Sequence, residues 1–468
     1  MEHIHLIGIG GTGLSAIARV LLERGYTVSG SDMQDSPLAQ AVREAGAQVY
    51  IGHAAENITG ADLVVRSSAI PESNPEVQAA LRQGIPVLKR AAFLGKLLEN
   101  ALGIAIAGTH GKTTTTAMLA WTLTALGQEP SFIVGGVVNN LGTNARAGRG
   151  EIFVIEADEY DRTFLGLQPR MAVITSVEHD HPDIYPAPED FRAAFRDFIG
   201  RLTPDGTLLL CADDPGALDL LPAARGRGIR TLTYATQQAA DYTAENLRPV
   251  PGAGYEFDLA LSGQGATGGR QRAALRIPGE HNVRNALAVL GIIHQLGLPL
   301  DAAAQALGEF RGAGRRFDVL GEAGGVIVID DYGHHPTEIR ATLRAAQARY
   351  PGRPLWAVWQ PHTYSRTEAL FDGFAASFAD ADHVVVTEVY RSREPVDPGF
   401  SPRSLVKAMR HRDAHFVPAL AEATAFLLAR LQPGDVLIVF SAGDANRISR
   451  QVYESLIRTG SPVRTASP

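Results

Sequence analysis

The sequence predicts an α/β protein of three domains, each built on a mostly parallel sheet with helices on its faces. Short Val- and Ile-rich runs alternate with Ala/Leu/Arg stretches of helical spacing, and this alternation starts again at two places along the chain. The length of 468 residues agrees, since a domain takes roughly 150 residues. The composition, 45% hydrophobic and 20% charged, is that of a folded chain and not of a disordered one.

The first alternation fills the N-terminal part of the chain. Its expected strands are residues 3–9, 26–30, 47–51, 63–67 and 86–89. Near residue 100 this pattern stops, and the apolar run 104–107 begins a new first strand. Because each α/β domain builds its own sheet, we place the first domain at residues 1–99.

Two further alternations follow. The expected strands of the second are residues 104–107, 152–155, 171–175 and 207–210, and a Gly/Gln/Ala-rich section at residues 262–269 is typical of a hairpin. After Arg315-Arg316-Phe317 the pattern starts a third time, with strands expected at residues 325–329, 355–359, 383–387 and 435–440. We therefore place the second domain at residues 100–314 and the third at residues 315–468.

Composition also excludes several partners. The formal net charge of -7 at pH 7 gives no broad positive field, so we expect no nucleic-acid partner. No apolar run reaches the roughly 18 residues of a membrane helix, and Met1 leads into a strand without a basic signal-peptide start, so we expect a cytoplasmic protein without membrane contact. The single cysteine, Cys211, is expected to be a core residue in a reducing compartment.

A glycine-rich loop follows the first expected strand. The segment Gly8-Ile9-Gly10-Gly11-Thr12-Gly13 fits GxGxxG, and Asp32 ends the next strand, where a carboxylate reaches a ribose hydroxyl. Glycines let the backbone approach a pyrophosphate, and the following helix N-terminus offers N–H groups to it. The loop therefore indicates a diphosphate ligand. These residues alone leave open NAD, another nucleoside diphosphate, or a structural turn without a ligand.

A second glycine loop opens the second domain. The segment Gly108-Thr109-His110-Gly111-Lys112-Thr113 follows a strand and leads into an apolar helix expected at residues 116–126, the setting of a nucleotide-triphosphate loop. Lys112 is expected to reach the β- and γ-phosphates, and Thr113 to hold magnesium. Only two residues separate Gly108 from the Gly-Lys pair, where the common form has four. The alternative is a turn that carries a surface lysine.

Acidic groups follow two strands of the same domain. Glu156, Asp158, Glu159 and Asp161 come after strand 152–155, and the segment 178–183 (EHDHPD) comes after strand 171–175. Both groups are expected at the carboxyl edge of a parallel sheet, where ligands bind. Hard carboxylate oxygens suit magnesium, and solvated acidic turns are the alternative. Zinc is a competing use of the histidines of the second segment, although no cysteine or third histidine accompanies them nearby.

Six ordered motifs together resemble the Mur ligase family over nearly the full chain. They are GTHGKT (108–113), IEADEYD (155–161), VEHDHPD (177–183), GEHNVRNALA (279–288), GAGRRFD (312–318) and IDDYGHHPTEI (329–339). The resemblance implies a Rossmann-like domain for a UDP-sugar, a central phosphate-loop ATPase with a parallel sheet, and a C-terminal Rossmann-like α/β domain that closes over the nucleotide. It thereby reassigns the first glycine loop from NAD to UDP.

Within this family the chain is most similar to the branch that joins L-alanine to the lactyl carboxylate of UDP-N-acetylmuramate. The resemblance implies ATP as co-substrate, Mg²⁺ as cofactor, an acyl-phosphate intermediate, and a monomer or homodimer. It implies closure of the C-terminal domain about a hinge at residues 316–319, because acyl phosphates hydrolyse in water. Histidines of the C-terminal domain are only candidates for the general base.

The resemblance also implies roles for residues at matching positions. Catalysis is carried by Lys112, Glu156, His181 and Arg316, and magnesium is held by Thr113, Glu156 and His181. ATP is bound by Gly108, Thr109, His110, Gly111, Lys112, Thr113, Thr114, Asn282, Asn285, Arg316 and Asp331. The UDP-sugar is bound by Gly8, Gly10, Gly11, Thr12, Gly13, Asp32, Ser67 and Ser68. The amino acid is bound by His335, His362 and Arg366.

Departures from the family pattern refine this interpretation. Several sister ligases carry a carbamylated lysine on the helix expected at residues 189–199, where this chain has Phe195, and the alanine-adding branch lacks that lysine too. Ser176 and Tyr160 stand where many relatives have asparagine and serine. The rival hypotheses are a recycling ligase that attaches a tripeptide to the same UDP-sugar, a catalytically silent UDP-sugar-binding protein, and an NAD-dependent dehydrogenase.

Overall fold

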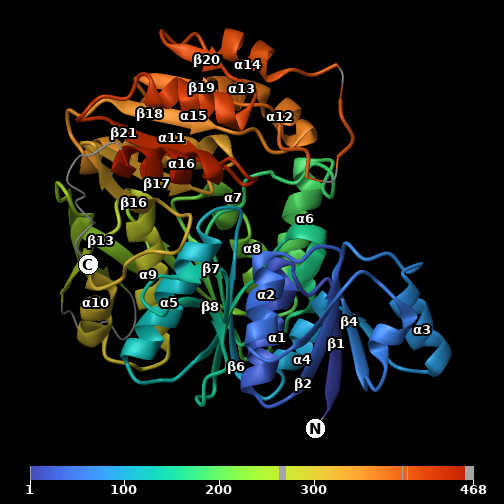
Figure 1. Cartoon of the computed structure of the whole chain (residues 1–468). Helices are drawn as coiled ribbons and strands as arrows, with labels where there is room; N and C mark the ends of the chain where they lie inside the picture. Colours follow the sequence, from blue (N-terminus) through green and yellow to red (C-terminus); the bar gives the residue numbers. More distant parts are fainter. Residues whose placement is uncertain (1, 263–269, 393, 398, 459–468) are drawn as a thin grey trace.

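The computed structural model describes residues 2–262, 270–392, 394–397 and 399–458. Three sheets of five, ten and six strands follow one another along the chain. Figure 1 shows the first and second sheets side by side, with the third, in orange and red, above them. The predicted three-domain α/β architecture is confirmed. The exact boundaries at residues 99/100 and 314/315 stay a prediction.

The N-terminal sheet is entirely parallel, with strand order β3-β2-β1-β4-β5. Its elements are β1 (His3–Ile7), α1 (Thr12–Glu23), β2 (Thr27–Asp32), α2 (Pro37–Glu44), β3 (Gln48–Ile51), η1 (Ala55–Ile58), β4 (Leu63–Arg66), α3 (Pro75–Gln83), β5 (Val87–Lys89) and α4 (Arg90–Leu98). The chain order reverses between β1 and β4, and ligands of open α/β sheets bind at such a switch point. β1 ends at Ile7, two residues earlier than predicted, because Gly8 turns the chain with a φ of 91°.

The middle sheet has a parallel centre with antiparallel additions at both edges, in the order β15-β14-β13-β12-β11-β10-β6-β9-β7-β8. Its first half contains β6 (Leu102–Ala107), α5 (Lys112–Ala125), β7 (Ser131–Val138), β8 (Thr143–Arg146), β9 (Ile152–Glu156), η2 (Tyr160–Gly166), β10 (Met171–Ile174) and α6 (Pro188–Ile199). Its second half contains β11 (Thr207–Cys211), α7 (Pro215–Leu218), α8 (Leu221–Gly226), β12 (Arg230–Ala235), β13 (Tyr242–Pro249), β14 (Tyr255–Leu261), β15 (Gln271–Leu275), α9 (Glu280–Gln295) and α10 (Leu300–Gly308).

The predicted hairpin at residues 262–269 falls mostly on residues 263–269, which lie outside the described residues. The flanking strands β14 and β15 do pair antiparallel. At the centre of the domain, β6 lies between β9 and β10, and the helix α5 packs against α9 and α10. Every residue of β6 from Gly103 to Ala107 is buried, as expected for a strand covered on both faces.

The C-terminal sheet has the order β16-β17-β21-β18-β19-β20. Its elements are β16 (Asp318–Ala323), β17 (Val326–Asp331), α11 (Pro336–Arg349), β18 (Leu355–Trp359), α12 (Tyr364–Ala369), α13 (Phe371–Ala375), β19 (His383–Val386), α14 (Pro402–Ala408), β20 (Ala414–Phe416), α15 (Leu420–Leu428), β21 (Val436–Phe440) and α16 (Asn446–Arg458). The prediction that this sheet opens at residue 325 is wrong, because β16 comes first and pairs antiparallel with β17.

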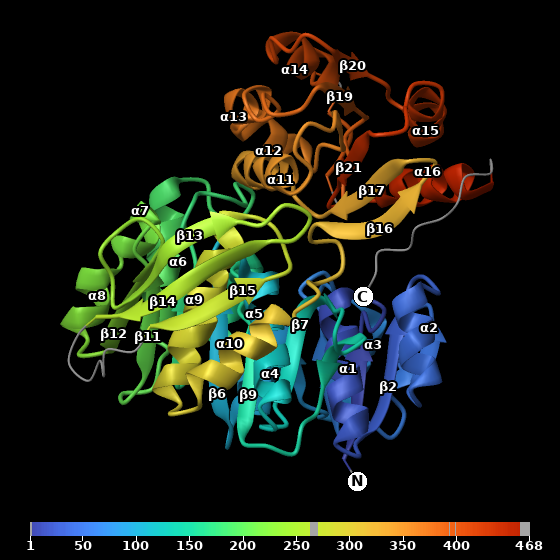
Figure 2. The same cartoon turned by 90° about the vertical axis from the view of Figure 1, so that its left-hand side faces the viewer.

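The C-terminal domain lies over the carboxyl ends of the middle strands. In Figures 1 and 2 the helix α11 sits above the central part of the middle domain, across the seam from α5 and α7. Hydrogen bonds from β6–α5 and β10–α6 loops reach α11 and α12 across this seam. Among the described residues, no helix has the length and apolar character needed to span a membrane.

Candidate active site at the seam between the middle and C-terminal domains

The phosphate loop joins β6 to α5 and is held by the chain that follows β10. Gly111 caps α5 in a left-handed conformation, φ 82°, and a methyl group there would meet the side-chain oxygen of Asn285 at 2.8 Å. The Thr109 N–H donates to the Ser176 carbonyl at 2.9 Å, and the His110 N–H donates to the Ser176 hydroxyl at 2.9 Å. The hydroxyl of Ser176 therefore supports the loop directly.

Lys112 begins α5 and points back across its own loop. Its Nζ donates to the carbonyl oxygens of Gly108 and Thr109 at 2.5 and 3.2 Å, and to Glu159 Oε1 at 2.8 Å. Burial lowers the pKa of Lys112, but the Glu159 carboxylate outweighs it and the net pKa is raised, so the ammonium is charged. The loop therefore holds a positive charge where a triphosphate would lie.

Glu156, at the end of β9, contacts the phosphate loop on the other side. Its Oε1 accepts from the Thr113 hydroxyl at 2.9 Å and its Oε2 accepts from the Gly135 N–H at 2.7 Å. Burial raises the pKa of this carboxyl, although Lys112 lowers it in part. A buried carboxylate is stabilised by a bound cation.

The oxygen atoms near Lys112 fit a magnesium ion. Glu156 and Thr113 present carboxylate and hydroxyl oxygens, and Glu159 Oε2 is buried without a hydrogen-bond partner among the described residues. His181 lies close by, with Nε2 at 3.6 Å from Glu159 Oε1. The structure thus brings together the three predicted metal-binding residues Thr113, Glu156 and His181 around the loop, and adds Glu159 to them. Their roles as ligands stay a prediction.

A buried ion pair crosses the seam beside His181. Arg366, on α12 of the C-terminal domain, donates from Nε to Asp180 Oδ1 at 2.7 Å, and the two side chains are 5% and 4% exposed. The same guanidinium contacts His181 Nδ1 at 3.2 Å and His362 Nδ1 at 3.0 Å. Burial raises the pKa of Asp180, but Arg366 overrides it and the pKa lies well below its usual range. Arg366 therefore contacts both His362, four residues earlier in the same predicted segment, and the predicted metal residue His181.

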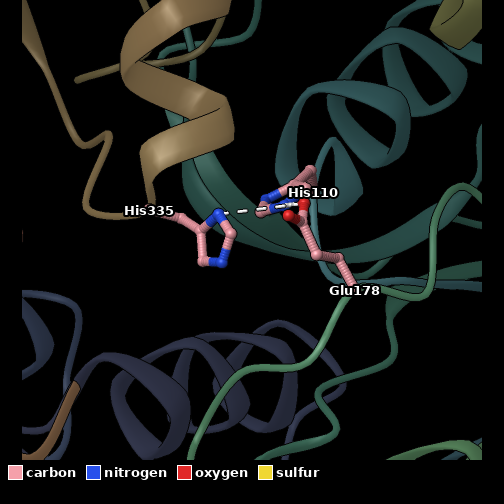
Figure 3. Close-up of side chains that lie close together, drawn as sticks. All are labelled: His110, Glu178 and His335. Carbon is pink, nitrogen blue, oxygen red and sulfur yellow. Dashed lines mark hydrogen bonds and ion pairs between the residues drawn. The ribbon is translucent and has the colours of Figure 1, made fainter. Parts of the chain in front are cut away.

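His335 and His334 face different neighbours. The His335 ring lies 4.7 Å from the His110 ring, with Nδ1 3.8 Å from Glu178 Oε2 (Figure 3). The His334 Nε2 lies 4.0 Å from Asp180 Oδ2, and its ring lies 6.1 Å from that of His362. Of the two, His334 is therefore the one beside Arg366, and the predicted amino-acid role of His335 stays a prediction. Burial lowers the pKa of His334 to about 3 and that of His335 to about 4, so both are neutral at pH 7.

A cavity of about 210 Å³ lies next to the phosphate loop. Its lining includes most of the predicted ATP-binding residues: His110, Gly111, Thr114, Asn282, Asn285, Arg316 and Asp331. Asn282 Oδ1 accepts from Asn285 Nδ2 at 3.1 Å, which fixes the pair against Gly111. Burial raises the pKa of Asp331 to about 6, and its oxygens accept from the backbone of Phe317 and Gly333. The cavity also takes in Cys211, which is buried as predicted.

The N-terminal glycine loop forms a separate turn at the switch point of its own sheet. Gly8 N–H donates to the Ser31 carbonyl at 2.8 Å, and the Gly10 N–H donates to Asp32 Oδ2 at 3.0 Å. A methyl group on Gly8 would lie 3.1 Å from Ser67 Cβ, so Ser67 adjoins the loop, whereas Ser68 is exposed. Asp32 therefore shapes the loop, and its contact with a ribose stays a prediction.

Arg90, which no motif predicted, connects this glycine loop to the middle domain. Its guanidinium lies against Gly13 at the start of α1, where a methyl group would overlap it. The NH2 group donates to Asp158 Oδ2 at 3.2 Å and to the Thr163 hydroxyl at 3.1 Å. Asp158 precedes Glu159, the carboxylate that holds Lys112. Arg90 thus joins the N-terminal glycine loop to the segment that follows β9.

Three family descriptions match the chain in order. "Mur ligase family, catalytic domain" matches residues 3–101, "Mur ligase middle domain" matches residues 106–293, and "Mur ligase, glutamate ligase domain" matches residues 315–443. Together they cover most of the chain and all three sheets.

Similar proteins match over the full length. A UDP-N-acetylmuramate–L-alanine ligase from Roseiflexus sp. (strain RS-1) is 46% identical over 97% of this chain and 99% of its own. The ligase of the same name from Salinibacter ruber is 42% identical over 98% and 96%. Among solved structures, a UDP-N-acetylmuramate–alanine ligase from Thermotoga maritima has a TM-score of 0.82 and 30% identity, covering 98% of this chain and 100% of its own. A murein peptide ligase from Psychrobacter arcticus has a TM-score of 0.70 and 26% identity, covering 99% and 100%.

Proposed function

Because this chain belongs to the Mur ligase family, we propose that it joins L-alanine to the lactyl carboxylate of UDP-N-acetylmuramate at the expense of ATP. The observation that carries the proposal is the meeting of three groups at one seam: Lys112 on the phosphate loop, Glu156 beside it, and Arg366 from the C-terminal domain. Full-length similarity to alanine ligases supports the choice of amino acid. We further propose that the enzyme acts in the cytoplasm.

Carboxylate activation is the first task of the site. A carboxylate is a poor electrophile, so one of its oxygens attacks the γ-phosphorus of ATP, the bond from that phosphorus to the β-bridging oxygen breaks, and ADP leaves with the electron pair. Phosphoryl transfer needs charge neutralisation and in-line positioning more than covalent help. The Lys112 ammonium supplies positive charge on the phosphate loop. Arg316, which lines the cavity from the C-terminal side, supplies a second.

We propose that Thr113, Glu156 and His181 would hold magnesium, with Glu159 available beside them. When bound there, the ion would supply positive charge that offsets the charge developing on the phosphate. Lys112 shares Glu159 with this group at 2.8 Å, so the lysine and the metal-binding residues form one unit around the loop. We further propose that the enzyme is a monomer or a homodimer.

Amide formation is the second task. The alanine amine, as the free base, attacks the acyl carbon, the tetrahedral intermediate expels inorganic phosphate, and the amide remains. We propose that Arg366 attracts the amino-acid carboxylate, since its guanidinium is the cation that the C-terminal domain contributes beside His181. Burial lowers the pKa of His362 to about 4, so this neutral ring accepts hydrogen bonds but is a weak base at pH 7.

Isotope transfer tests the activation step. With ¹⁸O in the lactyl carboxylate, the oxygen that attacks the γ-phosphorus leaves with the phosphate when the amide forms. We expect one ¹⁸O atom in each inorganic phosphate released with L-alanine present, measured by mass spectrometry. Unlabelled phosphate with labelled amide product would exclude an acyl phosphate and, with it, the proposed role of Lys112.

Arg90→Ala is expected to weaken UDP-N-acetylmuramate binding about tenfold or more, without a change in the KM for ATP. The guanidinium beside Gly13 adds positive charge to a helix N-terminus that binds anions, and a hydrogen bond to a charged group contributes about 1.5–3 kcal/mol. Isothermal titration with the UDP-sugar measures the effect. Arg82→Ala, on the exposed surface of α3 in the same domain, is the matched control. Equal affinities for wild type and Arg90→Ala would contradict the role.

A further inference from the structure

The His110 ring lies between carboxylates of two domains. Its Nε2 is 2.9 Å from Glu178 Oε2 in the middle domain, and its Nδ1 is 3.2 Å from Glu338 Oε1 on α11 of the C-terminal domain. Ionised carboxylates only accept hydrogen bonds, so each ring nitrogen must carry a hydrogen to satisfy both contacts. The geometry therefore assigns the imidazolium form to His110, with two charge-assisted hydrogen bonds that cross the seam.

We propose that His110 is a positioning residue whose imidazolium holds the start of α11 against the phosphate loop when the C-terminal domain is closed. The inference rests on the proposed function, because closure matters for a reaction that must exclude water. It assigns to the histidine of the loop a task separate from the phosphate contacts expected of its neighbours Gly111 and Lys112.

Glu338 explains how one ring can position a helix. Its Oε2 accepts from the backbone N–H groups of His334 and His335 at 2.9 and 3.3 Å, which caps the first turn of α11. Its Oε1 accepts from His110. The charge on His110 thus fixes the carboxylate that orders the segment carrying His334, the neighbour of the Asp180–Arg366 pair. A path of contacts therefore leads from the phosphate loop to the proposed amino-acid side of the site, with the 4.0 Å approach of His334 to Asp180 as its last step.

Charges around the ring balance only when His110 is protonated. Glu178 and Glu338 bring two negative charges, and Arg316 NH1 lies 3.8 Å from Glu338 Oε1. The other titratable neighbours are the rings of His335 and His281, and burial lowers the pKa of each to about 4, so both are neutral. A neutral His110 would leave two carboxylates facing one guanidinium. A further bond across the seam joins the Thr337 hydroxyl to Glu178 Oε1 at 2.9 Å.

A divalent cation is the competing occupant of this cluster. Ligand atoms of His110, Glu178 and His335 all lie within 4.8 Å of one another (Figure 3). However, a metal needs a lone pair on His110, which an imidazolium lacks. His335 Nδ1 already accepts from the Thr337 N–H at 3.3 Å. These contacts favour a proton over a metal ion, and the experiment below separates the two.

His110→Asn is expected to lower kcat/KM for L-alanine about ten- to hundredfold, because the charge-assisted pair is lost. The Kd for UDP-N-acetylmuramate should not change, since that ligand belongs to the N-terminal domain. X-ray scattering with UDP-sugar and a non-hydrolysable ATP analogue should report a larger radius for the variant than for wild type. His110→Lys, which keeps a positive charge, is expected to recover part of both losses. His415→Asn, which removes a ring bonded to Asp413 at 2.6 Å away from the seam, is the matched control.

The pH dependence gives a readout that a merely structural role would not move. Burial lowers the pKa of His110, but Glu178 and Glu338 outweigh it and raise the pKa to about 9. Because the pKa is raised, the two hydrogen bonds from the His110 imidazolium to Glu178 and Glu338 are fully present below the ordinary histidine pKa of about 6.5. They are lost as the pH rises through 9. Closure by scattering should therefore weaken above pH 9 in wild type, and His110→Lys should move this limit upward.

Each outcome decides the inference. Unchanged kcat/KM and an unchanged scattering radius in His110→Asn would overturn it. A second experiment adds a transition-metal chelator in the presence of excess Mg²⁺. If closure is then lost and Zn²⁺ restores it, a metal ion and not a proton occupies the cluster, and the inference is also overturned. Failure of the proposed function is distinguishable, since wild type would then release no alanine-dependent phosphate, while nucleotide-induced closure and its dependence on His110 remain measurable.

Discussion

Lys112→Met is expected to lower alanine-dependent phosphate release on the order of 10³-fold, while the affinity for UDP-N-acetylmuramate stays at the wild-type value. The ammonium on the phosphate loop neutralises charge during phosphoryl transfer, and we expect an effect at the lower end of the roughly 10³–10⁵ in rate that an arginine finger contributes to the same task. The UDP-sugar loop lies in another domain and keeps its contacts. Steady-state phosphate release and titration with the UDP-sugar measure the two quantities.

Glu159 loses its positively charged partner in the Lys112→Met variant, and a substitution of Glu159 therefore provides the control. Its side chain is 1% exposed and Lys112 is its cation at 2.8 Å, so Lys112→Met leaves a buried charge that costs about 3–5 kcal/mol of stability. Adding Glu159→Gln removes that charge. We expect the double variant to regain thermal stability and to stay inactive. A double variant that turns over within tenfold of wild type would contradict the role of Lys112 in phosphoryl transfer.

Asp180→Ala is the second change with a large expected effect. It leaves the Arg366 guanidinium buried without its 2.7 Å partner, and removal of one member of a buried pair costs about 3–5 kcal/mol. Because the pair spans two domains, the cost falls on the closed state, and kcat/KM for L-alanine should fall by about 10² or more. Thermal unfolding of the middle domain should change less than turnover does.

The control for Asp180→Ala is a surface pair of similar geometry. Asp205 lies 2.9 Å from Arg170 in the middle domain, with both side chains more than half exposed. Exposed pairs contribute about 0–1 kcal/mol, so Asp205→Ala should leave kcat/KM within a factor of about five. Similar small effects of both substitutions would show that the Asp180–Arg366 pair does not determine closure.

The parallel strands could be predicted because they are covered on both faces. Runs such as β6 (Leu102–Ala107) and β21 (Val436–Phe440) are nearly continuous in apolar residues, and glycine loops mark where they end. Several strands toward the edges of the middle and C-terminal sheets could not. β13 (Tyr242–Pro249) is largely polar and half-exposed, so only its pairing with β12 and β14 makes it a strand. The missed strand β16 likewise depends on pairing with β17.

The candidate site, too, could be predicted from the sequence only in part. Contacts within one domain, such as that of Thr113 with Glu156 beside the phosphate loop, follow from motifs at strand ends. Contacts between domains do not, since Asp180 and Arg366 are 186 residues apart and meet only when α12 lies over β10. Arg90 lies in no motif, and its proximity to Gly13 is a product of the sheet order. Lys112, conversely, was predicted for phosphates, but its pairing with Glu159 was not.

Phe195 is a departure from the family pattern that both the sequence and the structure help to interpret. The helix α6 carries it where several sister ligases have a modified lysine, and in the structure its ring is fully buried against Phe164 and Phe191. A fully buried phenyl ring offers no metal ligand. The proposed magnesium ligands of this chain, Thr113, Glu156 and His181, lie outside α6.

The choice of amino acid is the central claim, and one competition assay tests it most directly. Phosphate release from ATP is measured with UDP-N-acetylmuramate and either L-alanine or the tripeptide L-alanyl-γ-D-glutamyl-meso-diaminopimelate, each at equal concentration, with Lys112→Met as the blank. We expect turnover with L-alanine, product mass increased by one alanyl residue, and no tripeptide-dependent release above the blank. Turnover with the tripeptide and none with L-alanine would contradict the account and assign the chain to the recycling ligases.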